Sequence, residues 1–413
     1  MIRISGQHYM RLFAVSVVVM LLVLQTGCWS RKEIETLAFV MASGVDFAEM
    51  PNRIMLTAQI AKPKALAAAA MGGSDLERAV WTVSSTGNTI FEAIRHLARQ
   101  SSRRAFFAHS QWVILGEDVA RAGINNVLDA YERDPESRAG AKLAVVKDGK
   151  ASDFLQTESE LESIGAEAYL GILDDASEAL STVVDVDIHE FFKVMASEGI
   201  EPVAVRVEII DRLPDVDVRG QMEQSCISTA PRISGAAVFK DRMLVGWLDE
   251  AETRGYNWVR GRVKGSVLTI EDPKEDGQYM TIAILGADSS IEVEMKDDRP
   301  VAKVRIQAEA NFGETQHMVG RTEDSNLLAK AIIRRFAEAI RQEVHQAIDK
   351  AQEEYGSDIF GFGQAIHRKY PKVWKNLRSN WNDDGFKKLN VTVEVKTKIR
   401  QIGLVEINLP ESR

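Results

Sequence analysis

Apolar residues open the chain as one short block and then recur with two different periods. Residues 12–24 form a nearly unbroken apolar run (LFAVSVVVMLLVL). Further along, short apolar stretches and period-two alternation predict β-strands, and apolar residues every three or four positions predict amphipathic helices. Strands and helices therefore follow one another along the chain, a pattern typical of an α+β or mixed α/β protein.

The first expected unit, residues 28–186, alternates between the two kinds of element. Strands are predicted at residues 37–45, 54–60, 80–84, 112–115 and 143–146, and helices at residues 90–98, 118–132, 151–155 and 161–173. Residues 65–73 (ALAAAAMGG) are expected to form an exposed loop, because glycines close the segment. The pattern predicts a β-sheet flanked by helices.

Two further units follow, residues 187–262 and residues 263–413. The middle unit has a predicted helix at 189–196, strands at 203–210, 235–239 and 244–247, and a polar loop at 214–231. The last unit has predicted strands at 267–270, 279–285, 291–295, 301–310 and 389–399, around a long helix at 324–354. We expect three serial domains, each a β-sheet flanked by helices, behind a signal peptide at residues 1–27.

The long helix carries one continuous apolar stripe. Its members recur every four residues: Leu328, Ile332, Phe336, Ile340, Val344 and Ile348. Such a stripe covers one face of a helix and predicts packing against a sheet. A partner-binding face is the alternative.

The first apolar block is too short to span a bilayer. Thirteen residues at the helical rise reach ~20 Å, against ~30 Å of hydrocarbon. Arg3 and Arg11 precede the block, and Thr26, Gly27 and Cys28 follow it. This order is typical of a signal peptide, and its end resembles the lipobox of bacterial lipoproteins, although Gln25 stands where that motif prefers leucine. The resemblance implies an S-diacylglycerol and an N-acyl chain on Cys28; a signal anchor with an incidental cysteine is the alternative.

Two or three acyl chains would hold the protein stably at the outer face of a membrane, since one chain alone is marginal. Removing residues 1–27 deletes two arginines and takes the formal net charge from −9 to −11. This acidic balance argues against nucleic acid as a partner and against electrostatic adhesion to anionic lipid. Cys226 is then the one remaining thiol, which excludes an intramolecular disulfide and a cysteine-rich zinc site.

Catalytic signatures are missing from the sequence. There is no GxSxG elbow, Walker A loop or HExxH motif, and His189-Glu190 is followed by Phe-Phe-Lys, which lacks the second zinc ligand. The paired carboxylates lie in expected turns, where acids usually face water: Asp174-Asp175, Asp297-Asp298 and Asp383-Asp384. We therefore predict no catalytic residue, metal site or cofactor, and a protein that is not an enzyme.

Several short motifs occur in a fixed order along the chain. They are residues 27–34 (GCWSRKEI), 44–46 (GVD), 87–93 (GNTIFEA), 107–111 (FAHSQ), 116–117 (GE), 133–136 (RDPE), 149–151 (GKA), 234–239 (SGAAVF), 246–249 (GWLD), 252–255 (ETRG), 358–363 (DIFGFG), 367–371 (HRKYP), 372–375 (KVWK) and Trp381. Together they resemble the Ger(x)C family, the lipoprotein C subunits of spore germinant receptors. The resemblance covers essentially the whole mature chain.

The resemblance implies three α/β domains and a complex with two integral-membrane partners, the receptor A and B subunits. It places the protein at the inner membrane of a spore, where the complex detects small nutrients and triggers germination without catalysis. It does not say whether this subunit contacts the germinant. A solute-binding surface lipoprotein of a transporter is the alternative function, and an anchored surface enzyme is a second.

Some motif residues have expected structural tasks. Asp358 is placed to cap the helix after the long stripe, and Gly361 and Gly363 permit sharp turns. Trp374 and Trp381 lie seven residues apart and would share one helix face, where core packing is favoured over a partner interface.

Overall fold

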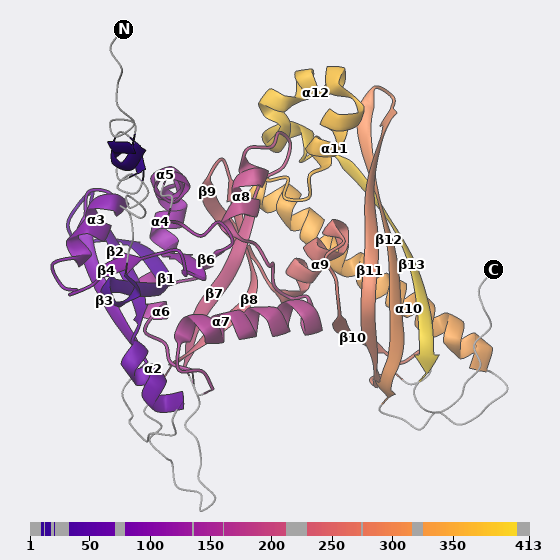
Figure 1. Cartoon of the computed structure of the whole chain (residues 1–413). Coiled ribbons are helices and arrows are strands. Elements are labelled where there is room, and N and C mark those ends of the chain that lie inside the picture. The colour runs from indigo at the N-terminus through magenta and orange to yellow at the C-terminus, as the bar shows by residue number, and fades with distance from the viewer. Residues whose placement is uncertain are drawn as a thin grey trace, which may run out of the picture.

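The structure, a computed structural model, describes most of the chain beyond the signal region (Figure 1). The described residues are 10–11, 13–17, 20, 33–70, 79–133, 136–159, 161–211, 229–273, 276–315 and 325–402. Cys28 and Cys226, on which the lipidation and thiol predictions rest, lie outside them. The described residues form two sheets with helices packed on them, a mixed α/β fold as the sequence predicts.

The first sheet has nine strands and extends from residue 37 to residue 248. Its order is β3-β2-β1-β5-β6-β7-β8-β9, with the short β4 paired to β1. The strands are β1 (Leu37–Phe47), β2 (Ile54–Ala61), β3 (Val80–Gly87), β4 (Arg104–Phe106), β5 (Trp112–Leu115), β6 (Lys142–Val146), β7 (Val203–Asp211), β8 (Thr229–Lys240) and β9 (Met243–Leu248). The central strands β1, β5, β6 and β7 run parallel, and antiparallel strands flank them on both sides.

Helices cover both faces of this sheet. Along β5, Trp112 and Ile114 belong to the core on one face, with α6 (Ala151–Phe154) and α7 (Gly165–Asp175). The alternate residues Val113 and Leu115 belong to the core on the other face. That face is covered by α3 (Ile90–Leu97), α4 (Glu117–Ala122), α5 (Asn125–Arg133) and α8 (Ile188–Met195). The central strands are continuously apolar because both of their faces are buried.

The second sheet has four strands and one long helix. Its order is β10 (Ser266–Glu271), β11 (Tyr279–Lys296), β12 (Arg299–Thr315) and β13 (Asn390–Ile402). Helix α10 (Ser325–Asp349) continues through a π-helical turn (Lys350–Tyr355) and lies along one face. Ile332, Phe336, Ile340, Val344 and Ile348 of its stripe are all buried, so the predicted core packing is confirmed. The opposite face carries charged residues, as the alternation along β12 and β13 requires.

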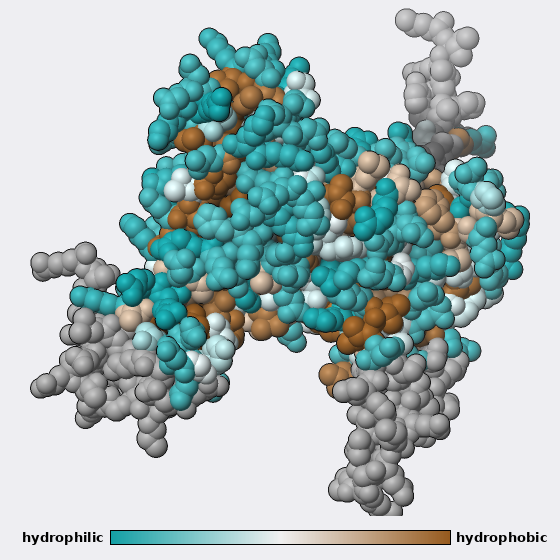
Figure 2. Space-filling model, turned by 180° about the vertical axis from the view of Figure 1, so that it is seen from behind, coloured by the Kyte–Doolittle hydropathy of each residue, from teal (hydrophilic) through white to brown (hydrophobic). Residues whose placement is uncertain are grey.

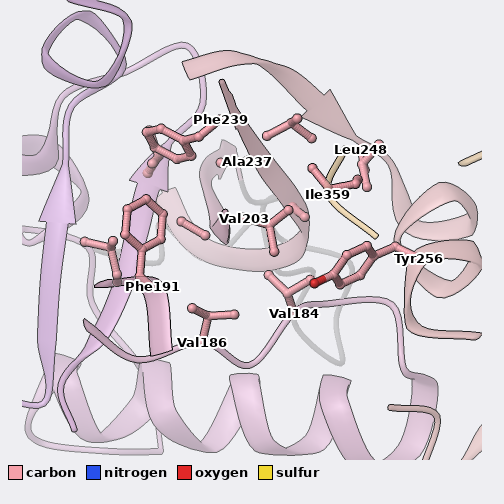
Figure 3. Packing of buried hydrophobic residues seen from close by; sticks show 14 of the residues in the cluster. Val184, Val186, Phe191, Val203, Ala237, Phe239, Leu248, Tyr256 and Ile359 are labelled. Atoms are coloured by element: carbon pink, nitrogen blue, oxygen red, sulfur yellow. The ribbon is translucent and has the colours of Figure 1, made fainter. Parts of the chain in front are cut away.

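Helix α9 (Glu250–Arg260) joins the two sheets and packs closely on α10. A Cβ on Gly255 would lie 2.2 Å from the backbone oxygen of Glu343, so only glycine allows this approach. The Glu343 carboxylate accepts hydrogen bonds from Arg254 Nε at 3.0 and 3.1 Å and from Trp258 Nε1 at 3.0 Å. The core continues across the joint, where Tyr256 and Ile359 meet the residues under β7 and β8 (Figure 3).

Two sequence predictions are wrong in detail. The described strands form two sheets instead of three, because β6 pairs directly with β7 across the boundary expected at residue 187. The extents of the three domains stay predictions. The loop expected at residues 65–73 is in part a helix, α2 (Pro63–Ala70), since a run of alanines outweighs the glycines beyond its end.

Candidate interaction site at the joint of the two sheets

A polar cleft opens where the first sheet meets the C-terminal helices. It encloses about 540 Å³ between the segment after α8, the β8–β9 turn, α12 (Pro371–Leu377) and the π-helical turn at Trp381–Gly385. Its charged lining is Glu198, Glu201, Lys240, Asp241, Arg242, Arg378 and Asp383. A neighbouring cleft of about 650 Å³ along α5 and α8 shares Met195 and Arg242 with it. The two clefts form one charged concave region.

A fully buried carboxylate, Asp358, supports this region from beneath. It accepts hydrogen bonds from the backbone N–H groups of Gly361 (2.8 Å), Phe362 (3.2 Å) and Gly363 (2.7 Å), and from Trp381 Nε1 (2.9 Å). These backbone groups open α11 (Phe362–Lys369), whose N-cap residue is Gly361, so Asp358 caps the first turn from three residues upstream. Burial raises the pKa of Asp358, and the four donors oppose that rise.

The two glycines of the DIFGFG motif serve different purposes. Gly361 has φ +84°, a left-handed conformation that turns the chain into α11, as predicted. Gly363 is needed for close packing instead. A Cβ there would lie 2.5 Å from Trp381 Nε1 and 2.9 Å from the Cα of Gly199.

Trp374 and Trp381 are both 3% exposed, which confirms core packing over a partner interface. Their rings meet edge to face at 5.5 Å, and Trp374 Nε1 donates to Glu198 at 2.6 Å. They do not share a single helix, however. Helix α12 ends at Leu377, and the turns that follow bring Trp381 back onto Trp374.

Glu201 is a half-buried acid in the lining of the cleft that the sequence analysis missed. Its carboxylate accepts hydrogen bonds from Asn382 Nδ2 at 2.6 Å and from the backbone N–H of Asp241 at 3.3 Å. Burial raises the pKa of Glu201 to about 7, and the nearby Asp241 and Asp358 carboxylates add to the rise. No motif marks it, because its environment comes from two segments separated by about 180 residues of chain.

The β8–β9 turn connects the cleft to its surroundings. Asp241 and Arg242 both have positive φ, 49° and 69°, as a tight hairpin turn requires. Arg242 Nη1 donates to Asn125 Oδ1 on α5 at 2.9 Å, and Lys240 pairs with Asp383 at 2.6 Å. One turn therefore contacts elements of both halves of the molecule.

The other residues considered as candidates from the sequence do not come together in one site, and some of them have structural roles. His189 lines the neighbouring cleft, whereas Glu190 pairs with Arg262. Asp297 and Asp298 form the β11–β12 turn, as expected, with positive φ. Among the described residues no cluster of three or more His, Cys, Asp or Glu side chains has the arrangement of a metal site.

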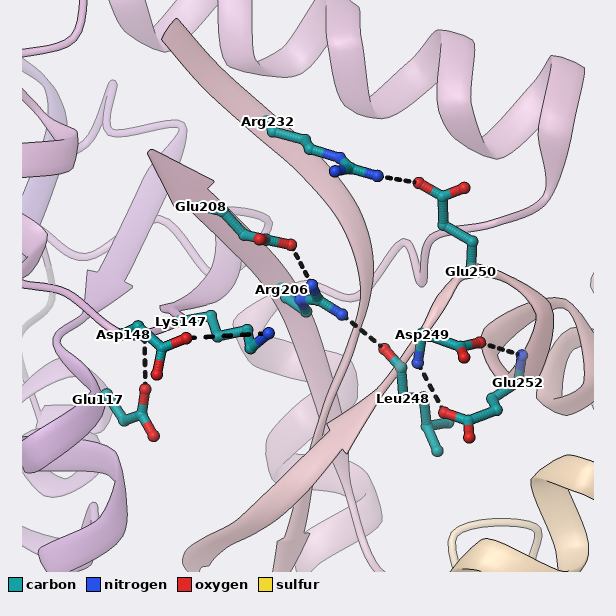
Figure 4. Close-up of polar contacts among 10 residues, drawn as sticks. All are labelled: Glu117, Lys147, Asp148, Arg206, Glu208, Arg232, Leu248, Asp249, Glu250 and Glu252. Carbon is teal, nitrogen blue, oxygen red and sulfur yellow. Dashed lines mark hydrogen bonds and ion pairs between the residues drawn. The ribbon is translucent and has the colours of Figure 1, made fainter. Parts of the chain in front are cut away.

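The motifs of the middle region maintain the architecture around the joint (Figure 4). Asp249 caps α9, accepting from the backbone of Glu252 at 2.8 Å, while Glu252 accepts from the backbone of Asp249 at 2.8 Å. Arg206 on β7 donates to the Leu248 carbonyl at 3.3 Å. A Cβ on Gly246 would lie 2.2 Å from the Tyr355 ring. Together with Arg206 and Tyr355, these motif residues build the joint between the sheets.

The surface around these elements is mainly hydrophilic, with separate hydrophobic patches on the face seen in Figure 2. Within the part of the chain that the structure describes, no helix is both long and apolar enough to cross a membrane.

Comparisons with known proteins agree over nearly the full length. A family described as "Spore germination protein N-terminal domain" matches residues 30–209, and "Spore germination B3/ GerAC like, C-terminal" matches residues 234–403. Spore germination protein KC of Bacillus subtilis (strain 168) is 28% identical over 385 residues, covering 92% of each chain. Spore germination protein B3 of the same organism is 24% identical and covers 94% of this chain and 98% of that relative. The crystal structure of the GerBC protein has the same fold, with a TM-score of 0.54 at 19% identity, over 87% of this chain and 98% of the other.

Proposed function

Because this chain belongs to the Ger(x)C family of spore germination proteins, we propose that it is the C subunit of a nutrient germinant receptor. In this role it is anchored by lipid on Cys28 to the outer face of the spore inner membrane. It assembles there with the integral-membrane A and B subunits and takes part in sensing without catalysing a reaction.

One observation carries the proposal. The two spore germination families match residues 30–209 and 234–403 in that order, so the relationship covers most of the chain. The KC and B3 relatives also carry germination in their names. A shared architecture over this length favours a shared place in the germination apparatus.

The charged concave region at the joint is the surface that we propose for contact with the partner subunits. Its rim combines arginines and carboxylates from α5, the segment after α8, the β8–β9 turn and the segment after α12. Charged rims of this kind set the orientation and the rate of association. The buried acids beneath the rim serve to fix its shape, which favours an assembly role over a catalytic one.

Assembly is tested by reversing charge on the rim. Arg242→Glu together with Arg378→Glu is compared with Lys396→Glu together with Lys398→Glu, a matched pair of exposed residues on β13. Copurification of the A and B subunits from spore membranes is expected to fall only in the rim variant. Equal recovery from both variants rejects this surface as the contact.

Function is tested by comparing spores from which the gene is deleted with spores that carry a reintroduced copy. We expect nutrient-triggered germination to need the chain, and a trigger that bypasses receptors to act normally without it. Normal nutrient germination without this chain, where no other receptor answers that nutrient, refutes the proposal. Screens with peptide, ester, glycoside and phosphoester substrates should give only background turnover.

A further inference from the structure

A second cleft lies at the end of the first sheet where the chain begins β1. It encloses about 380 Å³ between the ends of β1, β2 and β3, the start of α2 and the segment that follows α3. Three basic residues, Lys62, Lys64 and Arg103, line it, and none of its described lining residues is acidic. The charge of this lining is therefore positive, whereas the whole chain has a formal net charge of −9.

The same cleft presents apolar surface beside its positive charge. Trp81, Leu37 and Pro63 line it, and Trp81 is partly exposed. Tryptophan next to lysine and arginine is typical of protein surfaces that rest at the boundary of a bilayer, where the ring lies among the headgroups. The basic and apolar residues of the cleft therefore match the boundary of a bilayer, where charged headgroups lie next to hydrocarbon.

The position of the cleft in the chain points to the bilayer. The described chain resumes at Glu33, five residues after Cys28 in the sequence, and β1 begins at Leu37 in the cleft itself. Five extended residues reach about 17 Å. A lipid attached at Cys28 would keep this end of the sheet within a few residues of the membrane surface.

Among the described residues at this end, the remaining charges leave the formal balance positive. Exposed Arg99 lies just beyond α3, and Arg104 pairs with Glu136 at 2.8 Å. Glu33 and Glu35, also exposed, are the opposing charges on the segment that leads into β1. They lie outside the lining of the cleft.

We propose that this cleft docks on the anionic phospholipid headgroups of the bilayer that holds the Cys28 acyl chains. The inference rests on the proposed lipid anchor. Lysine and arginine donate charge-assisted hydrogen bonds to headgroup phosphates, and each basic residue at an anionic surface strengthens binding roughly five-fold. The acyl chains fix the protein to the membrane, and the cleft sets which end of the first sheet faces it.

The test uses the full chain with a specific protease site inserted between Ser30 and Arg31. The protein is reconstituted into vesicles of phosphatidylcholine, with or without phosphatidylglycerol, and the anchor is then cut in place. We expect the released chain to stay on the anionic vesicles at low salt, and to leave the neutral vesicles or dissociate at high salt. The triple variant Lys62→Glu, Lys64→Glu, Arg103→Glu should lower the partition coefficient at least about 100-fold.

The control reverses three exposed lysines far from this cleft, Lys330, Lys396 and Lys398, and should bind like the unaltered chain. Release of the unaltered chain from both vesicle types, or equal retention of the two triple variants, overturns the proposal. Sedimentation of the uncut protein with neutral vesicles measures attachment by the lipid anchor independently of the cleft. If the uncut protein does not sediment with neutral vesicles, lipid on Cys28 is refuted. Retention of the released chain on anionic vesicles, and not on neutral ones, still indicates docking by the cleft.

Discussion

At the scale of single residues, buried carboxylates hold the joint together. Asp358 is fully buried, and its hydrogen-bond donors among the described residues are four neutral N–H groups that stabilise its charge. The arrangement combines a helix cap with a tryptophan anchor. Each donor would lose its acceptor if the carboxylate changed.

Asp358→Asn should destabilise the protein, because the amide places its own donors against N–H groups in a buried site. We expect the free energy of unfolding to fall by about 2–3 kcal/mol. Denaturant titration measures the loss, and tryptophan fluorescence should report the altered environment of Trp381. Asp174→Asn, at an exposed position, is the control. Equal unfolding midpoints for the two variants would contradict the capping account.

Glu201 makes stability depend on pH near neutrality. Burial raises its folded-state pKa to about 7 from an ordinary 4.5, so between these values the folded chain binds more protons than the unfolded chain. Stability from this group is therefore fully present below about pH 4.5 and is lost as the pH rises through 7. The raised pKa of Asp358 acts in the same direction.

The expected loss from Glu201 between pH 5 and pH 8 is about 2 kcal/mol in the free energy of unfolding. Denaturant titrations at the two pH values measure it. Glu201→Gln, which cannot ionise, should remove most of this difference. A pH dependence that is the same in Glu201→Gln and in the unaltered chain would refute the assignment.

At the scale of elements, the stripe on α10 is the feature that the sequence predicted best. Phe336 lies in the middle of the stripe and is 0% exposed. Phe336→Ala should leave a cavity and cost ~3–5 kcal/mol, a large part of the ~5–15 kcal/mol typical of a domain. Thermal melting measures it, with Lys330→Ala on the same helix as control. If Phe336→Ala melts normally but the receptor fails to assemble, the stripe is a partner interface and not core.

Close contact between α9 and α10 depends on Gly255, which has no side chain. Gly255→Ala would place its Cβ 2.2 Å from the Glu343 oxygen, so the helices must separate. Overpacking of this kind costs about 1–3 kcal/mol, and the Arg254–Glu343 pair would also lengthen. We expect a lower melting temperature, whereas Gly171→Ala, in α7 with open space around it, should melt normally. Equal melting of the two variants would exclude close approach as the reason for glycine.

Elements were predictable where the pattern is local, and less so where pairing is distant. The turn at residues 240–242, strand β7 and helix α8 lie within one or two residues of the sequence prediction. The pairing of β6 with β7 was missed because about 55 residues of helix and loop separate them. Asp358 was recognised as a cap from its motif, but Glu201 was not recognised, since only the fold brings Asn382 and Asp241 to it.

At the scale of the whole molecule, the proposed attachment to the membrane rests on one thiol, that of Cys28. Cys28→Ala should leave both sheets folded, because the described core begins at Leu37. Membrane fractionation should find the variant in the soluble or mislocalised fraction. Retention at the normal level, with no diacylglyceryl mass on the N-terminal peptide, would refute the lipoprotein assignment.

The continuity of the first sheet has a consequence for exchanging parts between relatives. The N-terminal family match ends at residue 209 in β7, and the C-terminal match begins at residue 234 in β8, yet these two strands pair directly. A chimera joined between the two matches would thus divide one sheet between two parents, with mismatched side chains facing each other across the seam. A junction after α9, at Gly261, leaves that sheet with one parent, but α9 must then accept a foreign α10. Receptors that diversify by recombination are therefore expected to inherit this chain whole.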